Sequence, residues 1–159
     1  MPPFLQTFNM WRDPRNKELL PLFFSKGLGK IAADLLGVNA VRLYQDSMFV
    51  KRPGDGPTLW HSDLHMTPFD TNNFITVWIP LQDIPSFDDG GSALTFASAS
   101  HRDFAAHFWN DPHQDLGEGR YQECDYDEMK IGDATWHHGW TLHSFLLCES
   151  YIFLSCRSS

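Results

Sequence analysis

The tripeptide His61-Ser62-Asp63 places an imidazole and a carboxylate two residues apart. On a β-strand, residues i and i+2 point to the same face, so these two side chains could bind one metal ion without distorting the backbone. A third ligand has to come from another strand, and the segment Gly132–Ser144 supplies His137, His138 and His143. Two imidazoles and one carboxylate form the ligand set of non-haem Fe(II) oxygenases, which leaves coordination positions open for a co-substrate and O₂.

A histidine and an aspartate at this spacing also occur by chance as a surface pair, so the later histidines carry much of the metal interpretation. A closed, cysteine-rich site would instead be structural. The three cysteines, Cys124, Cys148 and Cys156, form no CxxC pair, so a thiolate zinc site is not predicted. Their odd, scattered count favours reduced thiols inside a cell.

Helices and then strands have to position these side chains. Apolar residues recur at helical spacing over Lys17–Ser25 and Lys26–Leu36, with Gly37 as a helix stop. After Gly37, apolar residues recur with a period of two residues, as in a β-strand. The clearest strand is Phe74–Leu81, in which Ile75, Val77, Ile79 and Leu81 face one way and Phe74, Thr76 and Trp78 the other.

Further short strands are predicted at residues 41–50, 93–97, 121–126, 134–138 and 141–147. Turn signals separate them, as at Pro53–Pro57 and Asp88–Gly91. Helices followed by many short strands predict a mainly β sandwich or barrel with a helical flank.

Composition limits the possible partners. The net charge is −8, and no basic cluster is present, which argues against nucleic-acid binding. The longest apolar runs are too short to span a membrane, and no signal peptide is visible. We therefore expect an intracellular, cytoplasmic protein whose partner is a small molecule. Nothing in the sequence predicts the oligomeric state.

Four blocks follow one another between about residues 30 and 145. They read LYQD…KRPG…WHSD at 43–63, VWIPLQD at 77–83, GSALTF…SHR at 91–102 and GD…H…HS at 132–144. In order and spacing these blocks resemble the phytanoyl-CoA dioxygenase family. The resemblance implies a double-stranded β-helix, which is a jelly roll of the cupin kind with N-terminal helices. It also implies Fe(II), with 2-oxoglutarate and O₂ as co-substrates, and hydroxylation of a C–H bond in a small organic or acyl substrate.

Carried over by position, the resemblance implies that His61, Asp63 and His143 are the iron ligands and catalytic residues. His143 occupies the family's slot for the distal histidine, and His138 matches a second, structural histidine. Trp78 matches a residue that lines the co-substrate pocket, although plain core packing would also explain it. Ser47 lies near another such position.

The sequence departs from the family pattern after His143. Family members carry an arginine on the next strand for the far carboxylate of 2-oxoglutarate, but the matching window, Tyr151–Leu154, has none. Arg157 takes that role only if the preceding loop is longer than usual. Residues 144–159 also lack the family's polar loop. The sequence therefore predicts one phytanoyl-CoA dioxygenase-like domain over residues 1–159, with an atypical tail and with material missing at both ends.

Two alternatives stay open. The first is a catalytically silent or truncated family member that retains the metal-binding scaffold, as the missing arginine would favour. The second is another metal-dependent enzyme on a cupin-like scaffold, such as a zinc hydrolase.

Overall fold

The computed structural model describes residues 4–52, 54–103, 116, 119–145 and, as backbone, 151–158. Strands in these ranges form two antiparallel sheets, so the prediction of a mainly β fold is confirmed. The larger sheet has the order β1-β2-β9-β4-β7 and the smaller one β3-β8-β5-β6. The strands are β1 Leu5–Phe8, β2 Leu43–Lys51, β3 Thr58–His61, β4 Ile75–Pro80, β5 Leu94–Ala97, β6 Glu123–Cys124, β7 Thr135–His138, β8 His143–Phe145 and β9 Tyr151–Ser158.

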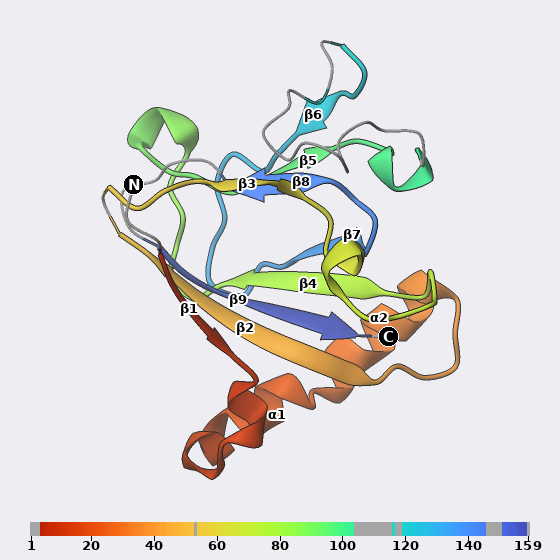
Figure 1. The fold of residues 1–159 in the computed structure, drawn as a ribbon. Helices are drawn as coiled ribbons and strands as arrows, with labels where there is room; N and C mark the ends of the chain where they lie inside the picture. Colours follow the sequence, from red (N-terminus) through yellow and green to blue (C-terminus); the bar gives the residue numbers. More distant parts are fainter. Residues whose placement is uncertain (1–3, 53, 104–115, 117–118, 146–150, 159) are drawn as a thin grey trace.

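The two sheets face each other as two layers, and the helices α1 and α2 lie against the outer side of the larger sheet (Figure 1). The α-helices are α1 Leu20–Phe23 and α2 Lys26–Leu36, and the 3₁₀ helices are η1 Met10–Arg12, η2 Pro14–Leu19, η3 Leu64–Met66, η4 Phe87–Asp89 and η5 Ser100–Arg102. Gly37 ends α2 in the left-handed conformation, as the sequence predicts. No helix among the described residues is long and apolar enough to cross a membrane.

Strand β4 separates two apolar clusters because its side chains alternate between the faces of the sheet. Trp78 packs into the cluster between the sheets, with Leu94, Phe96 and Phe145. Val77 packs into the cluster beneath the helices, whose other buried members are Met10 and Phe23. The alternation predicted for Phe74–Leu81 therefore matches the two faces of the strand.

Strand β1 precedes the two predicted helical segments, in a part of the sequence where no strand was predicted. It pairs with β2, and the turn that follows is held by Asp46, which is fully buried. The two carboxylate oxygens of Asp46 accept hydrogen bonds from the backbone N–H groups of Met10, at 2.9 Å, and Trp11, at 3.1 Å. This buried carboxylate ties the start of η1 to the larger sheet and so fixes the position of β1.

Strand β9 occupies the centre of the larger sheet. It is hydrogen-bonded to β2 on one side and to β4 on the other. Residues 151–158, in the segment that looked atypical in sequence, therefore join the two halves of this sheet.

Candidate active site

His61 and His143 form a cross-strand pair at the edge of a cavity between the sheets. His61 is the last residue of β3 and His143 the first of β8, and the two lie directly opposite each other in the antiparallel register. Directly opposite residues share a face of the sheet. The register therefore brings together two histidines that are 82 positions apart in the sequence.

Asp63 lies beside these two histidines, but it is not on the same strand as His61, although the sequence predicted that it would be. Its backbone is α-helical, with φ −66° and ψ −40°, and it precedes η3 rather than extending β3. The expectation that a single strand presents both side chains is therefore wrong. The turn is held instead by a 2.8 Å hydrogen bond from the N–H of Leu64 to the carbonyl of Gly139, beyond the end of β7.

The ligand atoms of His61, Asp63 and His143 all lie within 4.8 Å of one another. The Nε2 atoms of both histidines are 3.9 Å from Oδ1 of Asp63. Among the residues that the structure describes, this is the one group of three or more such side chains that could hold a metal ion. The structure thus brings together the three residues that the sequence singled out.

Backbone carbonyls determine how the two rings are oriented. Nδ1 of His61 lies 2.8 Å from the carbonyl oxygen of Leu59, and Nδ1 of His143 lies 2.9 Å from that of Thr141. Because a carbonyl only accepts, the proton of each neutral ring sits on Nδ1, and the lone pair of Nε2 faces Asp63. Three electron-rich atoms therefore converge without a proton between them, which is the arrangement that a bound cation would stabilise.

Burial also favours the neutral form of His143, which is the form that binds a cation. Its pKa lies well below the ordinary value of 6.5, chiefly because burial disfavours the charged ring, and the nearby rings of His137 and His61 act in the same direction. Asp63 opposes this effect without reversing it. A neutral imidazole beside a buried carboxylate fits a divalent metal ion such as iron.

His137 is a site residue that the sequence argument did not select. It lies on β7, is 6% exposed, and places Nε2 3.2 Å from Oδ2 of Asp63. His138 faces the other way and bonds to the carbonyl of Asn72 through Nε2, at 2.8 Å. The signal in the sequence was the alternation itself, because only one of two adjacent strand histidines can face the site.

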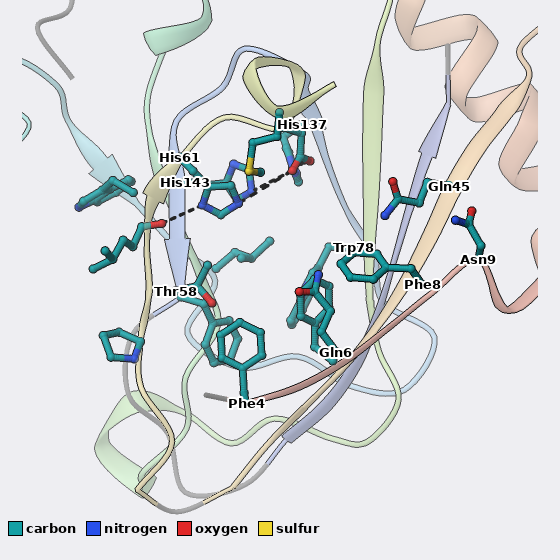
Figure 2. Close-up of a pocket in the computed structure, with 18 residues that line it drawn as sticks. Phe4, Gln6, Phe8, Asn9, Gln45, Thr58, His61, Trp78, His137 and His143 are labelled. Carbon is teal, nitrogen blue, oxygen red and sulfur yellow. Dashed lines mark hydrogen bonds and ion pairs between the residues drawn. The ribbon is translucent and has the colours of Figure 1, made fainter. Parts of the chain in front are cut away.

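The site opens into a cavity of about 840 Å³. Figure 2 shows His61, His137 and His143 at one end, with Gln6 and Phe8 of β1, Asn9 and Gln45 at a distance from them across the space. Most of the remaining wall is apolar, and it is formed by Phe4, Phe49, Pro57, Leu59, Trp60, Met66, Trp78, Leu94 and Phe145. The arrangement suits a small molecule that is anchored at a polar end and enclosed by apolar surface.

The residues predicted to bind the co-substrate lie along the larger sheet. Trp78 is buried and lines the cavity. Ser47 is buried on β2, which β9 separates from the strand of Trp78. It accepts a hydrogen bond from Nε2 of Gln45 at 3.2 Å, but it is not part of the cavity lining. Arg157 lies on β9, in register with Gln45 of β2 and with Thr76 of β4.

A comparison with known protein families shows which family this chain belongs to. The family model described as phytanoyl-CoA dioxygenase (PhyH) matches residues 6–144. The protein belongs to the phytanoyl-CoA dioxygenase family. The resemblance carried by the four sequence blocks is thereby confirmed. No curated protein sequence matches the chain.

Solved structures of similar fold include α-ketoglutarate-dependent proteins. The α-ketoglutarate-dependent carbocyclase SnoK from nogalamycin biosynthesis is 21% identical, with a TM-score of 0.80 over 98% of this chain and 64% of that one. The epimerase SnoN, in complex with Fe³⁺, α-ketoglutarate and nogalamycin RO, is 22% identical, with a TM-score of 0.75 over 96% and 62%.

EctD from S. alaskensis, with 2-oxoglutarate and 5-hydroxyectoine, is 14% identical, with a TM-score of 0.74 over 97% of this chain and 55% of that one. The likeness to these structures shows the fold. In each case this family member spans less than two thirds of the length of the protein it matches.

Proposed function

We propose that this family member is a non-haem Fe(II)- and 2-oxoglutarate-dependent dioxygenase that hydroxylates a small organic or acyl substrate. The observation that carries the proposal is the convergence of two imidazole Nε2 atoms and one carboxylate oxygen at the end of an apolar cavity. Family membership and the bound Fe³⁺ and α-ketoglutarate named for SnoN support iron and 2-oxoglutarate over other combinations.

His61, Asp63 and His143 would hold the iron, one ligand atom each, which leaves positions open for exogenous ligands. When bound, iron with 2-oxoglutarate and O₂ would oxidise a C–H bond to an alcohol, while the 2-oxoglutarate becomes succinate and CO₂. The polypeptide would bind the two organic molecules, orient the C–H bond towards the metal and exclude water with its aromatic wall.

Arg157 is our candidate for the far carboxylate of 2-oxoglutarate. Its two register partners both belong to the cavity side of the sheet, because Gln45 lines the cavity and the hydroxyl of Thr76 bonds to Asp63. Residues directly opposite in an antiparallel sheet share a face. A guanidinium can bind a carboxylate through two parallel hydrogen bonds. This register supports Arg157, three positions beyond the window Tyr151–Leu154 that the sequence comparison indicated.

The metal and the co-substrate can be tested together. We would purify the protein without oxygen, measure its metal content, and follow succinate formation with Fe(II), 2-oxoglutarate, O₂ and a panel of small organic and acyl substrates. We expect bound iron and more succinate than the His61→Ala variant produces. Bound metal without affinity for 2-oxoglutarate would instead favour a catalytically silent scaffold, and zinc with hydrolase activity would overturn the oxygenase proposal.

A further inference from the structure

We infer that His137 is a positioning residue that fixes Asp63 as a one-oxygen ligand of the metal. The inference rests on the proposed function, because it concerns how the same three-residue site is kept open. His137 is not one of the three residues whose ligand atoms cluster, yet its Nε2 lies 3.2 Å from Oδ2 of Asp63, which is not the oxygen that lies nearest to His61 and His143.

The two oxygens of Asp63 have different surroundings. Oδ1 faces Nε2 of His61 and Nε2 of His143, at 3.9 Å from each. Oδ2 accepts a hydrogen bond from the hydroxyl of Thr76 at 2.6 Å and lies 3.2 Å from Nε2 of His137. Oδ1 therefore faces the proposed metal position, whereas Oδ2 is hydrogen-bonded to side chains of the larger sheet.

The direction of the His137 hydrogen bond follows from the acceptor. A carboxylate only accepts hydrogen bonds. Nε2 of His137 therefore carries a proton and donates a hydrogen bond to Oδ2 of Asp63. Nε2 is then unable to bind a metal, and Nδ1 is buried without a hydrogen-bond partner among the described residues. This separates His137 from His61 and His143, whose Nε2 atoms carry lone pairs.

Position in the sheet explains why the two donors act together. Thr76 and His137 are directly opposite each other on β4 and β7, so they share a face and reach the same oxygen. The ring of His137 is also held between neighbours, with centroid distances of 4.3 Å to His143 and 5.4 Å to Phe96. The sheet therefore presents a rigid pair of donors to Oδ2.

The chemical consequence concerns the number of open positions on the metal. A carboxylate can bind a cation through one oxygen or both. Two donors on Oδ2 keep that oxygen turned towards the sheet and leave Oδ1 alone for the metal. Without His137, Oδ2 would be held by Thr76 alone, and its rotation into a position that a co-substrate needs would be less restricted.

Co(II) titration followed by visible absorption tests the inference, because the intensity of the Co(II) bands falls as coordination number rises. The variants would be His137→Met, which removes the donor at similar volume, His137→Gln, whose amide can still donate, and Thr76→Val, which removes the other donor. We expect the Met and Val variants to bind Co(II) about 10-fold or more weakly, with altered band intensity. The Gln variant should stay within about threefold of the parent protein.

Failure of the inference and failure of the proposed function give different results. If the parent protein binds Co(II), His61→Ala does not, and His137→Met matches the parent in affinity and spectrum, the inference is overturned while the metal site stands. If the parent protein itself binds no Co(II), the proposed function is overturned and the inference with it.

Nitrogen-15 NMR of the parent protein decides the case in which His137→Met does not fold. We expect Nε2 of His137 to carry its proton both without metal and with bound Zn(II). Loss of that proton when Zn(II) binds would make His137 a ligand and would overturn the inference.

Discussion

His61 and His143 face each other across β3 and β8 with ring centroids 4.2 Å apart, and each ring is fixed by the carbonyl two residues before it in the sequence. In each ring, Nδ1 is therefore hydrogen-bonded to the preceding backbone, and Nε2 faces Asp63. The two histidines of the proposed metal site are thus positioned by the pairing of two strands.

Replacement of His143 should weaken metal binding strongly, whereas replacement of a neighbouring histidine should not. We expect His143→Ala to weaken Co(II) binding by about 100-fold or more, because one of three ligands is lost. His138→Ala is the matched control, since His138 bonds to Asn72 instead of Asp63, and it should change affinity less than about threefold. Equal losses in the two variants, measured by the same titration, would contradict this assignment.

The metal-free protein should lose stability as the pH falls below about 6.5. His143 has a lowered pKa in the folded state, so below its unfolded value of 6.5 the unfolded chain binds a proton that the folded chain does not. The free energy of unfolding then decreases by up to about 1.4 kcal/mol per pH unit for that one proton, and the contribution is fully present above pH 6.5.

Urea unfolding at about pH 7.5 and about pH 5.5 measures this difference. A His143→Gln variant should lose less stability between the two pH values than the parent protein does. Part of the loss should remain, because burial also lowers the pKa of His138 and His101. A variant that loses as much as the parent protein would show that His143 is not the group responsible.

Gly139 should not tolerate a side chain. A Cβ there would lie 2.7 Å from the ring of Phe74 and 3.0 Å from Cβ of Leu64. We expect Gly139→Ala to destabilise the protein by about 1–3 kcal/mol and to weaken metal binding, because the Gly139 carbonyl holds the turn that carries Asp63. Gly29→Ala in α2 is the control. Apart from its chain neighbours and the backbone of α2, no described residue has an atom within 4 Å of a Cβ added there, so the substitution should stabilise the helix by about 0.5–1 kcal/mol.

Loss of Arg157 should separate co-substrate binding from metal binding. We expect Arg157→Ala to weaken 2-oxoglutarate binding by about 10-fold or more, since a charge-assisted hydrogen bond contributes about 1.5–3 kcal/mol, with Co(II) affinity unchanged. Arg157→Lys should restore part of the loss. Isothermal titration of the Co(II)-loaded protein checks this, and the exposed Arg102→Ala serves as control. Unchanged 2-oxoglutarate affinity in Arg157→Ala would remove Arg157 from the site.

Much of the sheet could be predicted from local pattern. The alternation over 74–81 gave β4 and its two faces, because each face meets a different apolar cluster. Strand β1 was missed because four residues, Leu5–Phe8, carry too little periodicity to outweigh the helical signal after them. Its pairing with β2 and the buried Asp46 are tertiary features that no local window contains.

The candidate site was predictable in composition but not in geometry. The spacing of His61 and Asp63 was interpreted as a strand, whereas a turn held by Gly139 brings the carboxylate into place. His137 was passed over because family position drew attention to His138. The orientation of β7 decides which of these two rings meets Asp63, and that orientation depends on pairing with β4.

The central position of β9 has a consequence for the alignment of the larger sheet. All three proposed metal ligands precede it in the sequence, yet β2 and β4 are not joined until residues 151–158 enter between them. Without β9 in place, β2 and β4 each present an unpaired strand edge. A slip of β9 by one residue would exchange its two faces. Correct alignment of β2 with β4, and so of the two sides of the cavity, therefore depends on the register of this single strand.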